Sequence, residues 1–80
     1  MTRERVGLIA GSGRFPVLFA ETARRHGVEV VAVAHRGETA AELAEVVDAI
    51  SWIDPGQLEA LIDALRSAQV RQAVMVGGIA

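Results

Sequence analysis

The residues of this chain with the clearest chemical potential are Gly11-Ser12-Gly13-Arg14. They follow the apolar segment 6–10 directly and open a stretch whose apolar residues recur at helical spacing. A strand, a glycine turn and a helix start in this order present backbone N–H groups that lack intrahelical partners and carry partial positive charge. Phosphate is the natural ligand of such a helix start, and Ser12 and Arg14 could add a hydroxyl and a guanidinium. A tight strand-to-helix connection without a ligand is the alternative, and the spacing leaves both open.

The dinucleotide-binding fingerprint G-x-G-x-x-G is incomplete, because Pro16 occupies the position of its third glycine. An NAD site also needs a carboxylate at the end of the second strand, and none occurs there before Glu38. NAD is therefore disfavoured. Arg36 could instead hold the 2′-phosphate of NADP, which keeps the NADP-binding half of a reductase as an alternative; a solvated loop cation is the simpler interpretation of Arg36.

Other polar residues have simpler explanations than chemistry. His35 could act as an acid or a base near neutral pH, but the sequence shows no partner for it and favours a polar loop residue. Asp54 with Glu38 could bind a metal ion, although a helix-capping role is sufficient to explain Asp54. His26 is expected to cap the end of a helix. Trp52 is expected to be a packing residue within a strand.

The elements that must position these residues alternate regularly. Apolar runs predict strands over about 6–10, 29–34, 49–53 and 72–76, and the segments between them predict helices. The first helix should run from about Phe15 to His26, the second should start from a Thr39 cap and end near Val46, and the third should start from an Asp54 cap. The β-α-β-α-β-α-β order predicts an α/β fold, a Rossmann-like parallel sheet with strand order 3-2-1-4.

The first helix is expected to bury one face of the helix against the sheet. The residues that recur on this face are Phe15, Leu18, Phe19, Thr22, Ala23 and His26.

Ligands of open α/β sheets bind at the carboxyl ends of the strands, near the point where the strand order reverses. Four segments should converge there: 11–15, 35–38, 54–57 and 77–78. From these segments we predict the following ligand-binding residues: Gly11, Ser12, Gly13, Arg14, His35, Arg36, Gly77 and Gly78.

Length and composition limit the classes of protein. The 80 residues make one small domain or part of one, with a net charge of −2 and no basic stripe, so no nucleic-acid partner is expected. The chain has no cysteine and therefore no disulfide. The first apolar run is too short for a signal peptide or a membrane span, so we expect a cytoplasmic protein and leave peripheral membrane contact open. Because the sequence stops after the fourth strand without a closing helix, we expect an incomplete domain with an open sheet edge.

Five motifs in order resemble one known family. They are segment 7–16 (GLIAGSGRFP), segment 30–39 (VVAVAHRGET), Trp52, the group 56–62 (GQLEALI) and segment 74–78 (VMVGG). Together they resemble the N-terminal domain of the LpxI family, the UDP-2,3-diacylglucosamine pyrophosphatases of bacterial lipid A biosynthesis. The resemblance covers nearly the whole chain.

The resemblance implies a two-domain hydrolase that cleaves UDP-2,3-diacylglucosamine to UMP and 2,3-diacylglucosamine 1-phosphate (lipid X). It implies a divalent metal such as Mg²⁺ in the full-length enzyme, a water that attacks the α-phosphorus, and a catalytic Asp in a C-terminal domain outside residues 1–80. Residues 1–80 would then contribute no catalytic residue, metal ligand or cofactor, but would bind UDP-diacylglucosamine or lipid X beside that second domain. The full-length protein could be a homodimer.

The resemblance implies a ligand-binding role for the glycine turn of this chain. Gly11, Ser12 and Gly13 match the family's turn, and segment 14–16 matches its continuation. Many relatives have Asn at the position of Ser12; a hydroxyl offers one donor where an amide offers two, so a side-chain bond to the ligand is in doubt there. A third hypothesis is a non-catalytic interaction module whose open sheet edge pairs with another chain.

Overall fold

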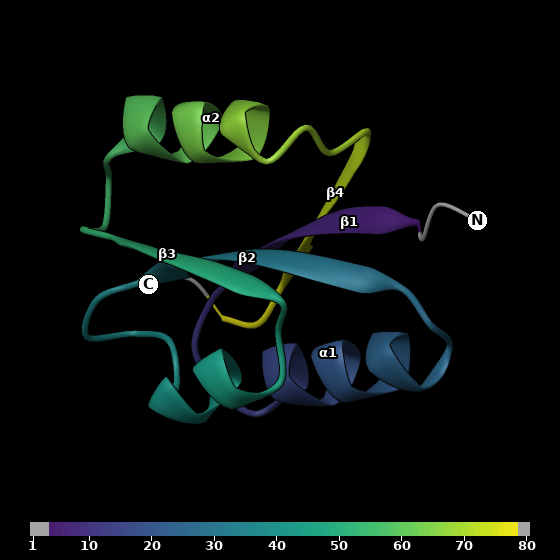
Figure 1. The fold of residues 1–80 in the computed structure, drawn as a ribbon. Helices are drawn as coiled ribbons and strands as arrows, with labels where there is room; N and C mark the ends of the chain where they lie inside the picture. The colour runs from purple at the N-terminus through teal and green to yellow at the C-terminus, as the bar shows by residue number, and fades with distance from the viewer. Residues whose placement is uncertain (1–3, 79–80) are drawn as a thin grey trace.

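The computed structural model describes residues 4–78, which form a four-stranded parallel sheet with helices on both faces (Figure 1). The elements in chain order are β1 (Arg5–Ala10), α1 (Phe15–Arg25), β2 (Glu29–His35), the 3₁₀ helix η1 (Ala41–Glu45), β3 (Ala49–Ile53), α2 (Leu58–Ser67) and β4 (Gln72–Val76). The strand order is β3-β2-β1-β4, so the predicted α/β fold and the predicted strand order are both confirmed. The central strands β1 and β2 could be placed because largely covered parallel strands read as continuous apolar runs. The edge strands β3 and β4 are mostly exposed or half-buried, although their apolar runs still marked their positions.

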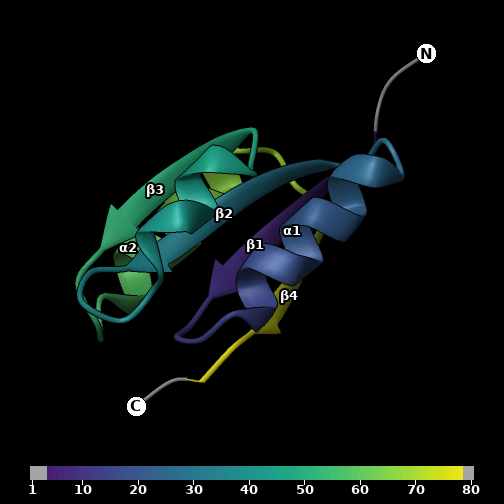
Figure 2. The same cartoon turned by 90° about the horizontal axis from the view of Figure 1, so that it is seen from below.

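The core lies mainly between the sheet and the α1 side of the molecule. α1 and η1 cover one face of the sheet and α2 covers the other, as Figures 1 and 2 show from two directions. The buried core cluster consists of Leu8, Ala10, Ala20, Val30, Ala32 and Leu43. On the opposite face, α2 has no fully buried residue. Gly7 of β1 allows the close approach there, because a Cβ on Gly7 would lie 2.8 Å from Cδ2 of Leu65.

The predicted buried face of α1 is wrong by about one position. Pro16 and Ala20 are the buried residues of α1, whereas Phe15 is 71% exposed and Leu18 is 46% exposed. Small side chains let the helix axis approach the sheet closely, so they occupy the centre of the contact although they are less hydrophobic than Phe15 and Leu18. Phe19 and Ala23 pack against the core from the flank of this face, as expected.

Both predicted helix caps are also wrong, for one shared reason. η1 starts after Ala40 with no side-chain cap, and α2 starts after Gln57 with no side-chain cap. The hydroxyl of Thr39 and the carboxylate of Asp54 instead bond to groups at the ends of neighbouring strands. The side-chain oxygens of Thr39 and Asp54 could each cap a helix, but they form hydrogen bonds or ion pairs with residues of other segments instead.

His26 caps the end of α1 as predicted. Its Nδ1 lies 2.8 Å from the carbonyl oxygen of Thr22, to which it donates. Gly27 follows with a φ of 74°, the left-handed conformation that commonly stops a helix.

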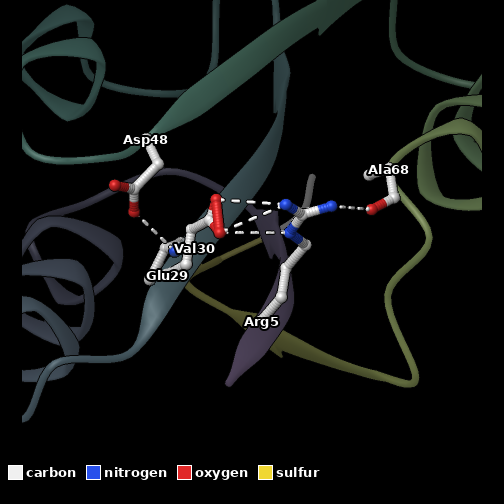
Figure 3. Close-up of polar contacts among 5 residues, drawn as sticks. All are labelled: Arg5, Glu29, Val30, Asp48 and Ala68. Carbon is white, nitrogen blue, oxygen red and sulfur yellow. Dashed lines mark hydrogen bonds and ion pairs between the residues drawn. The ribbon is translucent and has the colours of Figure 1, made fainter. Parts of the chain in front are cut away.

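The amino ends of the strands are held by a separate set of charges (Figure 3). The guanidinium of Arg5 pairs with the carboxylate of Glu29 at 3.2 Å and donates to the carbonyl oxygen of Ala68 at 2.8 Å. The carboxylate of Asp48 accepts the N–H of Val30 at 2.7 Å. These contacts join β1, β2 and the end of α2 at the edge of the sheet opposite to the glycine turn.

Candidate functional site at the carboxyl edge of the sheet

The peptide between Ala10 and Gly11 is held from both neighbouring strands. The carbonyl oxygen of Ala10 accepts from Nδ1 of His35 at 2.9 Å and from the hydroxyl of Thr39 at 2.8 Å. On the other side, the N–H of Gly11 donates to the carbonyl oxygen of Val76 at 2.8 Å. Both ends of one rigid peptide plane are therefore fixed, one through β2 and one through β4.

The next residue of the turn pairs with the segment that follows β4. Ser12 and Gly78 form an antiparallel bridge, with Ser12 N–H to Gly78 O at 2.7 Å and Gly78 N–H to Ser12 O at 3.1 Å. The hydroxyl of Ser12 donates to the same Gly78 oxygen at 3.0 Å. Both hydrogen-bond donors of Ser12 are therefore used within the chain, and neither points to a ligand.

Two of the predicted ligand-binding glycines serve this bridge directly. A Cβ on Gly11 would lie 2.3 Å from the carbonyl oxygen of Gly78. Gly77 has a φ of 104°, and a Cβ there would lie 2.6 Å from the carbonyl oxygen of Ser12. The structure thus places Gly11 and Gly77 in a contact between two backbone segments that no larger residue would permit, and Gly78 supplies the backbone partner of Ser12 in that contact.

The open part of the turn begins at Gly13. Its φ is 91°, and nothing lies within 4 Å of the position that a Cβ would take. α1 starts here with Arg14 at its N-cap position and no side-chain cap. Within residues 4–78, the N–H groups of Gly13, Arg14 and Phe15 find no hydrogen-bond acceptor, and the guanidinium of exposed Arg14 finds no partner. Three backbone donors and one cation are thus available to an anion.

His35 has partners that the sequence did not reveal. Because a carbonyl oxygen only accepts, the 2.9 Å contact with Ala10 requires a proton on Nδ1 of His35. In the neutral ring, Nε2 then carries the lone pair. The backbone N–H of His35 donates to the hydroxyl of Thr39 at 2.8 Å. His35 is thus a fixed, half-buried group at the end of β2 rather than a free loop residue.

Arg36 is engaged in an ion pair at the surface. Its Nη1 lies 2.8 Å from Oδ1 of Asp54, and both side chains are more than half exposed. The N–H of Arg36 also donates to the carbonyl oxygen of Ile53 at 2.8 Å, which ties the end of β2 to the end of β3. Arg36 follows β2, whereas the open N–H groups follow β1, the next strand in the sheet. The guanidinium of Arg36 is directed to Asp54 at the end of β3, on the other side of β2.

Asp54 and Glu38 were considered as a possible metal site, and within residues 4–78 they belong to no larger group of metal ligands. Across residues 4–78, no group of three or more His, Cys, Asp or Glu side chains is placed to hold a metal ion. The structure also adds a residue that the sequence analysis had assigned elsewhere: Thr39, expected to cap a helix, contacts the end of β1 instead. Its position four residues after His35 could have indicated the bond to the N–H of His35, because Thr hydroxyls commonly bond to a backbone group four residues before them, but nothing local indicates the bond to Ala10.

The parallel sheet in the order β3-β2-β1-β4 and the glycine turn after β1 define a Rossmann-like α/β domain. The family model of the LpxI N-terminal domain matches residues 5–80, and the chain belongs to this family of the lipid A pathway. No curated protein and no solved structure shows significant similarity to the chain. Among residues 4–78, no helix has the length and apolar content needed to cross a membrane.

Proposed function

We propose that this chain is the ligand-holding N-terminal part of a UDP-2,3-diacylglucosamine pyrophosphatase, in which the turn after β1 binds a phosphate of the substrate or of the product, lipid X. The observation that carries the proposal is the set of three N–H groups at Gly13, Arg14 and Phe15 without acceptors in the described chain. Membership of the LpxI N-terminal domain family supports the choice of ligand.

The physical argument rests on preorganisation. Anions are favoured at a helix start by the partial positive charge of its free N–H groups, an effect of about 0.3–1 kcal/mol at an exposed site. The turn that presents them is bonded to β2 through Ala10 and to β4 through Gly11 and Ser12. A fixed turn loses little conformational freedom when it binds, so more of the interaction free energy appears as affinity. Arg14 can add a charge-assisted hydrogen bond to the same phosphate.

The catalytic steps belong to residues outside the described chain in this proposal. The catalytic acid and the Mg²⁺ site would lie in a C-terminal domain, and the substrate would bind between that domain and the carboxyl edge described above. Cytoplasmic location with peripheral membrane contact, and a homodimer of the full-length protein, complete the proposal. The residues from 4 to 78 bring together no metal-binding group, so we derive no metal-dependent step from them.

Calorimetric titration with glucosamine 1-phosphate, the water-soluble headgroup of lipid X, tests the binding role. We expect saturable binding of the phosphorylated sugar and none of glucosamine at the same concentrations. Arg14→Ala should weaken binding about tenfold, because one charge-assisted hydrogen bond is lost. Arg25→Ala, at the other end of α1, is the matched control and should bind as the wild type does.

Two results would contradict the proposal. Equal binding of glucosamine and glucosamine 1-phosphate would show that the phosphate is not recognised. Release of UMP from UDP-2,3-diacylglucosamine by this chain alone would show that catalysis does not need residues outside it.

The NADP-binding alternative lacks a supporting observation. Arg36, the residue that would hold the 2′-phosphate, is paired with Asp54. Titration with NADPH, followed by nicotinamide fluorescence, separates the two ideas: micromolar binding would favour a reductase. An interaction module would instead form oligomers that do not respond to any of these ligands.

A further inference from the structure

We infer that Thr39 is a positioning residue for the glycine turn: its buried hydroxyl fixes the Ala10–Gly11 peptide and thereby the direction of the open N–H groups that follow. This inference rests on the proposed phosphate-binding role of the turn. Thr39 does not itself line the open part of the site, because its side-chain contacts go to the ends of β1 and β2.

Among residues 4–78, Thr39 is the only polar or charged residue that is buried, with 8% of its surface exposed. A buried hydroxyl is tolerated only where it is hydrogen-bonded. The hydroxyl of Thr39 donates to the carbonyl oxygen of Ala10 and accepts from the N–H of His35, both at 2.8 Å. Its backbone N–H closes the loop by donating to the carbonyl oxygen of His35 at 2.9 Å.

These bonds converge on one acceptor. The carbonyl oxygen of Ala10 receives the Thr39 hydroxyl and the His35 ring together, while the other end of the same peptide donates from Gly11 to Val76. A rotation of this peptide plane would break contacts on both sides. These bonds set the orientation of Gly11. The bridge to Gly78 then holds Ser12, and the bond from the N–H of Gly78 to the carbonyl oxygen of Ser12 is the last contact before the open N–H groups.

Loss of the hydroxyl changes the turn in a specific way. The N–H of His35 would lose its acceptor, and Ala10 would keep only the His35 ring as a donor. The peptide plane could then tilt, and the N–H groups of Gly13, Arg14 and Phe15 would converge less well on one phosphate. Binding of an anion depends on that convergence, so affinity should fall even where the fold survives.

Four variants separate positioning from stability. Thr39→Val removes the hydroxyl at nearly constant shape, Thr39→Ser keeps the hydroxyl, and Thr39→Cys substitutes a weaker donor of similar size. Thr22→Val is the matched control, because Thr22 is exposed on α1 and its side chain makes no hydrogen bond within residues 4–78. Each is studied by NMR at a temperature at which it is fully folded, with glucosamine 1-phosphate as the probe.

We expect the dissociation constant to rise about tenfold in Thr39→Val, as loss of one well-placed hydrogen bond would produce, and to stay within about twofold in Thr39→Ser and Thr22→Val. The ¹⁵N spectrum should show a proton fixed on Nδ1 of His35 in the wild type, and partial loss of that tautomer preference in Thr39→Val. If Thr39→Val does not fold, we expect Thr39→Cys to show a smaller rise in the dissociation constant and a smaller loss of the His35 tautomer preference.

Two results would overturn the inference. One is a folded Thr39→Val, or Thr39→Cys if Thr39→Val does not fold, that binds as the wild type does. The other is unchanged amide resonances from Gly11 to Phe15 in that variant. The second readout needs no ligand, so it decides the positioning role even if the wild type fails to bind glucosamine 1-phosphate, a result that would contradict only the proposed function.

Discussion

The hydroxyl of Ser12 donates to the carbonyl oxygen of Gly78 at 3.0 Å, and the N–H of Ser12 donates to the same oxygen at 2.7 Å. Two segments 66 positions apart in the sequence are joined by these bonds. The turn that follows β1 therefore rests on the segment that follows β4. This contact explains why Ser12 supplies no donor to a ligand and why the site begins one residue later, at Gly13.

Ser12→Ala should reduce the free energy of unfolding by about 0.5–1.5 kcal/mol, the net contribution of one hydrogen bond. The backbone bonds of the bridge remain, so the fold should be retained. Urea unfolding gives the measurement. Ser67→Ala is the control: Ser67 is exposed at the end of α2, and its hydroxyl makes no bond inside the described chain. A loss in Ser67→Ala as large as in Ser12→Ala would argue against the hydrogen bond from the Ser12 hydroxyl to Gly78.

Gly11→Ala should destabilise the chain by about 2–3 kcal/mol, in the upper range for overpacked sites. The new Cβ would meet the backbone oxygen of Gly78 at 2.3 Å, which cannot move without breaking the bridge. Gly7→Ala is the matched comparison, because its Cβ would meet the flexible end of Leu65 at 2.8 Å. Chemical denaturation should rank Gly11→Ala well below Gly7→Ala in stability; the reverse order would contradict the close backbone contact.

Gly13→Ala should cost about 1–2 kcal/mol of stability, because an L-residue is strained at positive φ. The cause here is conformational only, since no atom lies within 4 Å of the new Cβ. Gly37→Ala, also in open space at a φ of 80°, should lose a similar amount in thermal unfolding. A much larger loss in Gly13→Ala than in Gly37→Ala would indicate a packing contact at the turn that the structure does not contain.

The two ion pairs should differ in their importance. Asp54→Asn should change stability by less than about 1 kcal/mol, and the change should shrink in high salt, because the Arg36–Asp54 pair is mostly exposed. Glu29→Gln should cost more, because the Glu29 side chain is 24% exposed and its partner Arg5 is also fixed by Ala68. Unfolding experiments at low and high salt compare the two; equal losses at both salt levels would contradict this ranking.

The strands and their order could be predicted from the sequence because the relevant signals are local. Apolar runs between polar turns marked the four strands, and the alternation with helices implied the parallel sheet and its order. The glycine turn was also identified locally. The buried face of α1 was not, because hydrophobicity favoured Phe15 and Leu18 while close packing selected Pro16 and Ala20.

The details of the site depended on contacts between distant segments. The segment that begins at Thr39 has the form of a capping box, but the hydroxyl of Thr39 bonds to Ala10, 29 positions earlier in the chain, and caps no helix. The bridge between Ser12 and Gly78 has no local sequence signature at all, because backbone groups make most of it. Gly77 and Gly78 are predicted to bind the ligand because they follow the carboxyl end of a strand, and the structure shows that they also support the turn.

A map of the backbone amides that respond to phosphate shows where on this chain the anion binds. A ¹⁵N–¹H NMR titration of this chain with glucosamine 1-phosphate should shift the amides of Gly13, Arg14 and Phe15 most strongly. The amides of Gly11 and Ser12 should shift less, because their N–H groups already donate to Val76 and Gly78. Shifts confined to other parts of the sheet, or no shift at millimolar concentrations, would contradict the claim that the start of α1 holds the phosphate.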